Sequence, residues 1–281
     1  MFEIVRNGIF TTVSSPVYGK QDIGVTPGGV MDSFAYDTGN AILGNDATAP
    51  ALEILLAPSL RFNEDCYFVI TGAKYSNVSI SASSLTTIRH GQVTFVKAGS
   101  VIDFQQKEYG FRSYLCYAPA GHYNGENPEG RQLGNFSKIA SWVDDDNKIR
   151  VIEGPEFKYL ENKTLFLDEY WKVSNDTSSM GMRLENKWVG VTVDMKKNMV
   201  SEAVSNGTIQ LTPDGPIILL KHRQTVGGYP RIFNVISVDV DRLAQFSPGQ
   251  LLHFRKVSVK DAHNALKRRN QDILKIKNNF K

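Results

Sequence analysis

The sequence has few cysteines, no long apolar run and no group of residues spaced like metal ligands. Its 281 residues include two cysteines, Cys66 and Cys116. Both lie in apolar runs typical of strands, so we expect buried free thiols rather than a disulfide or a metal pair. No apolar run approaches the roughly 20 residues that span a bilayer. The first residues also lack the basic and then apolar order of a signal peptide. We therefore expect a cytoplasmic protein with no membrane segment and no bound metal.

Positive charge is scarce outside the C-terminal segment. The formal net charge is +3, yet residues 255–281 carry nine Lys or Arg against two Asp, which leaves a net charge of −4 for the rest. A solvated helix face, nucleic-acid binding and membrane binding are the alternatives for this basic segment. Nucleic-acid binding is disfavoured, because the rest of the chain is acidic and no aromatic residues alternate with the basic ones.

What is present is mostly a series of short β-type runs. Each has a few apolar or β-branched residues bounded by Gly, Asn, Asp, Ser or Pro, which is typical of a β-barrel or β-sandwich. The turn-rich, acidic stretch Tyr123–Lys148 predicts a boundary between an N-terminal β domain, residues 1–145, and a C-terminal β-barrel domain with a helical tail, residues 146–281. Within the second domain we expect a short helical turn near Ser201–Val204 and a continuing β run over Arg231–Val240.

Two helices are predicted within this β pattern. Asp32 is placed to cap a helix over Ser33–Leu43, and Gly44 follows as its C-terminal stop. At the end of the chain, Ser258 with Asp261 three residues later reads as a capping box. The apolar spacing that follows predicts an amphipathic helix, which docks on its own barrel or on a partner.

One stretch combines predicted strands with polar side chains and glycines. The runs Thr208–Leu211 and Pro216–Leu220 are joined by a turn at Pro213–Gly215 and predict a hairpin. The polar residues Lys221–Thr225 follow the second strand, and the chain then turns at Gly227–Pro230. Polar donors at a strand end, beside glycines that expose backbone N–H groups, suit an anionic or amide-bearing small molecule. A basic loop with an ordinary Gly-Gly turn is the alternative.

A second glycine-rich turn, Gly24–Asp32, leads into the N-terminus of the first predicted helix. Free N–H groups at such a turn can bind phosphate or carboxylate. A purely structural connection between a strand and a helix explains the same pattern.

Blocks of the sequence resemble one known family, and they occur in the same order along nearly the whole chain. They are Thr26–Asp32, Asn40–Asn45, Ala51–Glu53, Gly72–Ala73, Arg150–Pro155, Ser179–Leu184, Ser201–Val204, Gly207–Gln210, Pro213–Pro216, Arg223–Pro230 and Gln245–Gly249. The sequence is thus similar to the biotin-dependent carboxyltransferase subdomain A/B family. That family includes the second subunit of allophanate-hydrolase-type proteins, the Kip antagonist and the C subunit of bacterial 5-oxoprolinase.

The resemblance implies a mainly β fold of two cyclophilin-like barrel units with few helices. It also implies a partner subunit of the related carboxyltransferase subdomain C/D type, similar to the Kip inhibitor, and a role in ATP-dependent hydrolysis of a cyclic amide such as 5-oxoproline or in carboxyl transfer to an amide nitrogen. ATP would be bound by this chain or by the partner, and no biotin would be attached to this chain. A regulatory protein like the Kip antagonist, which sequesters a kinase inhibitor without catalysis, is the alternative.

The sequence departs from the family pattern in three places. Ser14–Lys20 replaces a Gln-Asp and Gly-Arg segment, residues 124–134 form a shortened loop, and His222 stands where an acidic residue is common. Changes in loops that would face a ligand fit the regulatory alternative.

Amide chemistry assigns roles to the polar residues of the second half. Opening a cyclic amide, or carboxylating an amide nitrogen, places negative charge on a planar O–C–N unit that Arg, Lys and backbone N–H groups stabilise. We therefore expect Arg223 and Lys221 to bind the anionic part of a small amide or carboxylate ligand. Asp214 is the nearest carboxylate that could act as a base, although a turn residue after a proline has a structural explanation as well.

Further residues would complete the ligand site. Gln224 and Thr225 would bind the amide, and Gly227 and Gly228 would supply backbone donors. Tyr229 would stack on the ligand or pack in the core. The remaining members would be Arg183 and Gln210 on neighbouring blocks, and Gly28, Gly29 and Asp32 from the N-terminal turn, facing the same cleft or the partner.

Overall fold

The structure is a computed structural model that describes residues 2–81, 85–123, 127–133, 147–186 and 199–280. The expected change at residues 124–134 therefore lies partly outside the described residues. Contacts within the chain divide it into two compact units. The first comprises Met1–Ser15, Asp32–Ser141 and Asn270–Lys281, and the second comprises Pro16–Met31 and Trp142–Arg269.

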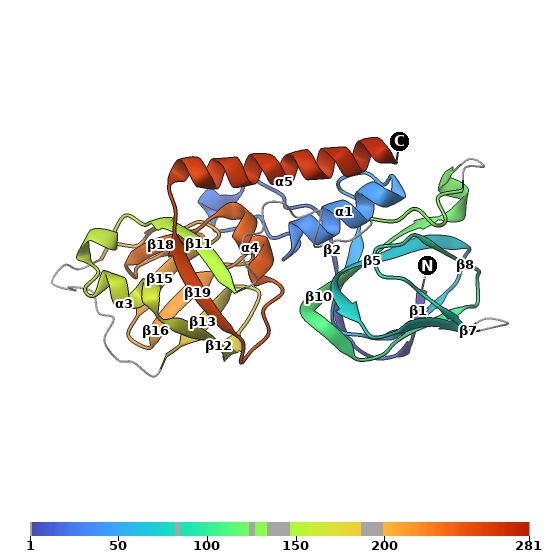
Figure 1. Cartoon of the computed structure of the whole chain (residues 1–281), viewed down its shortest axis with the longest axis horizontal. Coiled ribbons are helices and arrows are strands. Elements are labelled where there is room, and N and C mark those ends of the chain that lie inside the picture. Colours follow the sequence, from blue (N-terminus) through green and yellow to red (C-terminus); the bar gives the residue numbers. More distant parts are fainter. Residues whose placement is uncertain (1, 82–84, 124–126, 134–146, 187–198, 281) are drawn as a thin grey trace. The chain divides into compact units, whose positions relative to one another are not determined.

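The first unit contains two antiparallel five-stranded sheets (Figure 1). One has the order β1 (Phe2–Arg6), β4 (Ser59–Phe62), β9 (Val101–Phe104), β6 (Val78–Ser81) and β7 (Leu85–Thr87). The other has the order β2 (Ile9–Val13), β3 (Ala51–Leu56), β10 (Lys107–Pro119), β5 (Cys66–Tyr75) and β8 (Thr94–Val96). A short η2 turn (Ala120–Tyr123) follows β10. Alternating side chains from both sheets, such as Leu52, Ile54, Leu60 and Phe62, form a buried core.

Both cysteines are buried free thiols of this unit, as predicted. Burial raises the pKa of the Cys66 thiol to about 12 and raises the pKa of Cys116 as well. Thiols that remain protonated at neutral pH are poor nucleophiles and poor metal ligands.

Helix α1 (Ser33–Leu43) forms where the sequence predicted it. The Asp32 carboxylate accepts a hydrogen bond from the Ala35 N–H at 2.9 Å and so caps the first turn. Gly44 ends the helix with a φ of 72°, a left-handed conformation that glycine adopts without steric cost.

The second unit is a closed seven-stranded barrel (Figure 1). Its strands follow the order β11 (Lys148–Glu153), β18 (Arg231–Val235), β15 (Thr208–Thr212), β16 (Gly215–Leu219), β13 (Gly181–Glu185), β12 (Tyr170–Thr177) and β19 (Leu251–Lys256). The first and last strands, β11 and β19, pair in parallel and close the barrel. Phe166 of α3 (Lys163–Asp168) stacks against Phe233 and Phe254 in the core, and a short η3 turn (Phe157–Tyr159) packs beside them.

Two local predictions for this unit were wrong. The expected helical turn at Ser201–Val204 is a short strand, β14 (Glu202–Ala203), which pairs with β17 (Val226–Gly227). The expected β run over Arg231–Val240 ends at Val235, and α4 (Ser237–Leu243) follows it. The helix brings the buried Asp239 carboxylate within 2.7 Å of the Arg150 backbone N–H and 2.6 Å of its guanidinium. The Arg150–Asp239 pair forms in the context of α4. The hydrophobic pattern of the sequence does not reveal this pair.

The predicted C-terminal helix is α5 (Val259–Asn279), and Ser258 and Asp261 form its capping box, with the Ser258 hydroxyl 3.1 Å from the Asp261 N–H. Arg269 of α5 forms an ion pair with Asp241 of α4 at 3.1 Å, so the helix contacts its own second unit. In the part of the chain that the structure describes, no helix is long and apolar enough to cross a membrane. The fold is therefore mainly β, with one closed barrel, open sheets, few helices and a C-terminal helix.

Candidate functional site

Arg223 is a buried cation near the end of strand β16. Its side chain is only 8% exposed. Its Nε and Nη2 groups donate to the Val204 carbonyl at 3.3 and 3.2 Å, and Nη1 donates to the Asn206 side-chain oxygen. Burial lowers the pKa of Arg223, with the nearby Tyr18 acting in the opposite direction. Among the residues that the structure describes, no carboxylate lies within ion-pair distance of this guanidinium.

Lys221 has its charge neutralised within the protein. Its ammonium lies 3.0 Å from the Asp241 carboxylate of α4, and its side chain is 15% exposed. The Lys221 carbonyl accepts a hydrogen bond from the Thr26 hydroxyl at 2.9 Å. The contacts of Lys221 therefore fix the position of the segment that carries Arg223.

The N-terminal glycine turn lies against this segment, within the second unit. Gly28 and Gly29 have φ values of 60° and 88°, where other residues are strained. The Gly29 carbonyl is 3.0 Å from Nε2 of His222, and a Cβ on Gly29 would lie 3.0 Å from Pro16. The glycine turn and the segment after β16 therefore lie together, as expected for two parts of one site.

Neither Gly227 nor Gly228 has a positive φ, so neither is needed for an unusual backbone angle. A Cβ on Gly227 would lie 2.6 Å from Nε2 of Gln210. That nitrogen donates to the Tyr229 carbonyl at 3.1 Å, and Gln210 is 2% exposed. Gln210 therefore holds the β14–β17 ribbon on the outer face of the barrel, and its amide is used for this contact.

Three further predicted residues lie in or beside the ribbon. Gln224 is exposed, and Thr225 is half-buried, with its carbonyl accepting from the Val204 N–H at 3.0 Å. Tyr229 is 44% exposed. The segment from Gln224 to Tyr229 thus presents both polar and aromatic groups next to Arg223.

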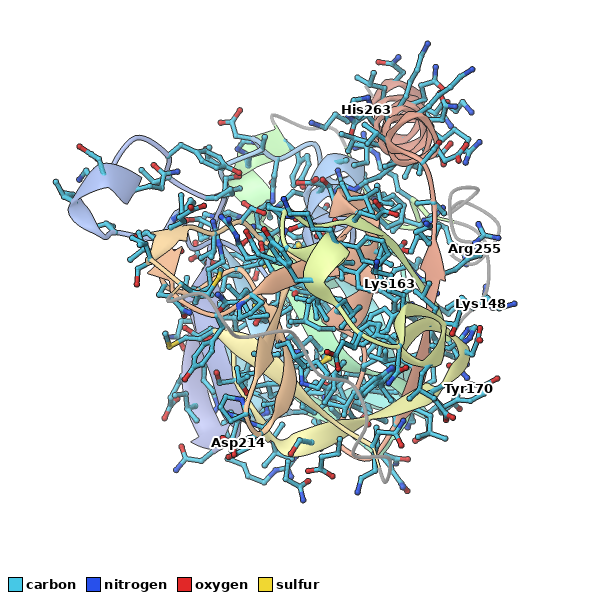
Figure 2. All side chains as sticks on the ribbon, turned by 90° about the vertical axis from the view of Figure 1, so that its left-hand side faces the viewer. Lys148, Lys163, Tyr170, Asp214, Arg255 and His263 are labelled. Carbon is cyan, nitrogen blue, oxygen red and sulfur yellow. The ribbon has the colours of Figure 1, made fainter. Side chains whose placement is uncertain are left out.

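Asp214 and Arg183 are not brought to this cluster. Asp214 lies in the turn that precedes the five-residue strand β16, whereas Arg223 follows the strand. At about 3.3 Å per strand residue, the two lie at opposite ends of it. Figure 2 shows Asp214 at the tip of the β15–β16 hairpin. The guanidinium of Arg183 reaches toward this tip, 3.9 Å from the exposed Asp214 carboxylate.

Asp32 belongs to the first unit, where it caps α1. Its backbone N–H donates to the Tyr114 hydroxyl at 2.8 Å, and that hydroxyl donates to Glu53 at 2.8 Å. Glu53 in turn lies 3.4 Å from Nε of the buried Arg112. Sequence reasoning missed this buried polar group, although Glu53 lies in one of the blocks that resemble the family.

Sequence reasoning also missed the groups that hold Arg223. Val204 and Asn206 lie between β14 and β15 and accept its hydrogen bonds. The only sequence feature that could have drawn attention to these residues is the block Ser201–Val204, which resembles the family pattern. Tyr18 lies within the segment Ser14–Lys20 that departs from the family pattern, and nothing in the sequence connects it with Arg223.

Comparison with known proteins identifies the family. The model described as carboxyltransferase domain, subdomain A and B, matches residues 23–123 and 119–256. The chain belongs to this family. It is 31% identical over 297 residues to the 5-oxoprolinase C subunit of Escherichia coli, and the match covers 94% of each chain. The resemblance that the sequence motifs predicted is thereby confirmed.

A more distant similarity connects this family member with much longer proteins. The chain is 26% identical to a urea amidolyase of Lachancea kluyveri, covering 92% of this chain and 17% of that protein. The crystal structure of the K. lactis urea amidolyase has the same fold over 98% of this chain and 20% of its own, with a TM-score of 0.81 at 22% identity. The protein therefore resembles the C subunits of 5-oxoprolinases and is related to the carboxyltransferase region of urea amidolyases.

Proposed function

We propose that the chain is one subunit of an ATP-dependent complex that hydrolyses 5-oxoproline to glutamate. The observation that carries this proposal is the 31% identity to a 5-oxoprolinase C subunit along 94% of both chains. Carboxyl transfer to an amide nitrogen is the related reaction that the weaker similarity to urea amidolyase supports. Both reactions act on a planar amide that bears or gains negative charge.

The proposal includes a partner. Catalysis would require a subunit of the carboxyltransferase subdomain C/D type, and ATP would bind to this chain or to that partner in the cytoplasm. We further infer that both units are variants of the cyclophilin-like barrel, the first with its strands divided between two sheets.

Arg223 is the residue that we assign to the carboxylate of the ligand. Its guanidinium is held in place by the Val204 carbonyl and Asn206, which use three of its nitrogens and leave N–H groups for an anion. Gln224 and Thr225 stand next to it and can bind the amide group. Donors held in place before the reaction stabilise charge that develops on the amide oxygen. Lys221, paired with Asp241, acts as a positioning residue.

The direct test is ATP-dependent release of glutamate from 5-oxoproline by this chain co-expressed with the subunits encoded beside it. Release that requires this chain, ATP and the companion subunits together supports the proposal. A stable complex that binds but turns over none of the substrate contradicts it.

That second result would support a regulatory protein like the Kip antagonist. One observation favours this alternative. Tyr18 lies on the segment that departs from the family pattern, in the loop whose Thr26 hydroxyl is bound to the Lys221 carbonyl beside Arg223. An aromatic residue at this position, 69% exposed, suits contact with a protein at least as well as contact with a small molecule.

A further inference from the structure

Exposed apolar side chains lie on the two segments of the second unit that contact the stretch from Lys221 to Thr225. We call this set the collar, and it consists of Val17, Tyr18, Ile23, Val25, Val200, Val226 and Tyr229, each between 44% and 77% exposed. Four of them come from the loop that contains η1 (Gln21–Ile23), and the others come from the β14–β17 ribbon and its neighbours. Single exposed apolar residues are ordinary, but a grouped set marks an interaction surface.

Hydrogen bonds join both halves of the collar to the segment that carries Arg223. The Thr26 hydroxyl of the η1 loop donates to the Lys221 carbonyl at 2.9 Å, and the Arg223 guanidinium donates to the Val204 carbonyl next to β14. Val204 is joined in turn to Thr225 by a backbone hydrogen bond of 3.0 Å, immediately before Val226. The apolar side chains therefore flank one buried cation.

The η1 loop has a regular shape that does not arise from packing in a core. A hydrogen bond of 3.0 Å from Val17 to Pro27 closes its base, and one of 3.1 Å from Val25 to Lys20 supports its tip. No residue of η1 is buried. A loop that holds large apolar side chains in water without burying any of them is suited to being covered by another molecule.

The collar is large enough for a specific protein interface. With roughly 150–250 Å² for a fully exposed aromatic residue and less for Val or Ile, its members together present on the order of 800 Å². One partner contributes about 800 Å² to a standard protein interface. Among the described residues of this surface charge is sparse, since Lys20 and Asp22 offset each other and Glu202 is paired with Arg231 at 2.5 Å. The matching surface is therefore apolar and close to neutral.

We propose that the collar is the docking surface for the companion subunit of the complex, which thereby covers Arg223. This inference rests on the proposed function, because it identifies where the partner of that complex binds. A different subunit fits better than a second copy, since the Escherichia coli relative is itself named as one subunit and the related region of urea amidolyase is 17% of a longer chain. Covering the collar would exclude water from the guanidinium and strengthen its attraction for a carboxylate.

The test measures the affinity of the full chain for the purified companion subunit that is encoded beside it. Ile23→Asp and Val226→Asp place a charge within the collar, and each should weaken binding by tenfold or more. Ile23 lies in an exposed loop, so that variant folds even if a charge in β17 disturbs the ribbon. Leu251→Asp is the matched control, because Leu251 is 50% exposed on β19 of the same barrel, and it should change the affinity less than twofold.

A second control lies away from the collar. In Figure 2, Tyr170 of β12 lies on the opposite side of the second unit from the blue loop that contains η1, and Tyr170→Ser should leave binding unchanged. The inference is overturned if wild-type chain and companion do not associate, if the collar variants bind as tightly as wild type, or if they alter only self-association of this chain.

The same experiment separates this inference from the proposed function. Turnover of 5-oxoproline by the collar variants should recover when the companion subunit is raised well above the weakened Kd, since these residues do not contact the substrate. Weakened docking without any turnover by the wild-type complex would support the docking surface and refute the proposed reaction.

Discussion

Replacement of Arg223 by Met distinguishes a ligand-binding guanidinium from a structural one. Met preserves much of the apolar volume but removes the charge and every donor. Arg223→Lys keeps the charge and loses the planar fork. The two variants therefore separate the need for charge from the need for paired N–H groups.

The structure allows the two effects of Arg223→Met to be weighed against each other. Hydrogen bonds from a charged donor contribute about 1.5–3 kcal/mol each, and the variant loses those to Val204 and Asn206. It also removes a buried charge that lacks a carboxylate in the described part of the chain, which offsets much of that loss. We expect a net destabilisation of about 1–2 kcal/mol. Loss of a contact with a substrate carboxylate costs about 2–3 kcal/mol more, which is roughly 30- to 150-fold in kcat/KM.

The assay is ATP-dependent glutamate release by the reconstituted complex, with urea unfolding of the same preparations as a measure of stability. Arg255→Met, on β19, is the control for loss of a basic side chain and should retain wild-type kcat/KM. Arg223→Lys should lie between wild type and Arg223→Met. If the kcat/KM of correctly folded Arg223→Met complex stays within twofold of wild type, the guanidinium serves only to hold residues 204–206, and our assignment is wrong.

Three further changes test the contacts that position the site and stabilise the units. Glu156 is held by Arg231, whose hydrogen bonds lower the pKa of the carboxyl below its usual 4.5. This stabilisation is present above that pH and is lost as the pH falls through the lowered pKa. Glu156→Gln should therefore lower the free energy of unfolding by about 1–3 kcal/mol at pH 7 and by little in acid, as measured by urea unfolding. Gly227→Ala should lower the Tm, because the new Cβ would lie 2.6 Å from Gln210 Nε2, and adding Gln210→Ala should restore part of the loss, since the clash disappears. Tyr114→Phe removes one donor and one acceptor from a fully buried group and should destabilise the chain by about 1–3 kcal/mol in urea at pH 7, whereas an unchanged unfolding midpoint would show that the hydroxyl bonds contribute nothing.

Local sequence patterns predicted helices and turns well where a residue type has a specific structural role, such as capping a helix or forming a turn. Asp32 and Gly44 bound α1, and Ser258 begins the capping box of α5, because only a few side chains satisfy free backbone groups at helix ends. The hairpin of β15 and β16 followed from its Pro-Asp-Gly turn. These signals act within a few residues, so a sequence contains all the information they require.

The errors and omissions involve contacts between distant residues. Aspartate is usually exposed, yet Asp239 lies buried against Arg150, 89 positions away. In the structure this contact is made from α4 rather than from a strand. Likewise, the sequence does not reveal that the lack of a side chain on Gly227 makes room for Gln210, and the role of Gly227 as a backbone donor stays a prediction. Neither pairing leaves a periodic signal, because each depends on how the barrel closes.

Three other cations of the second unit whose side chains are at most 15% exposed each lie beside a carboxylate. Arg150 lies 2.6 Å from Asp239, Lys221 lies 3.0 Å from Asp241, and Arg231 lies 2.9 Å from Glu156. Burying a charge without a counter-charge is costly, which is why such pairs are the rule. Arg223 is as buried as these residues, but the described residues provide it with a carbonyl and an amide oxygen instead of a carboxylate. Within the described residues, a cation that is buried without a carboxylate has the property expected of an anion-binding site. A partner covering the collar would then keep water from competing for that anion.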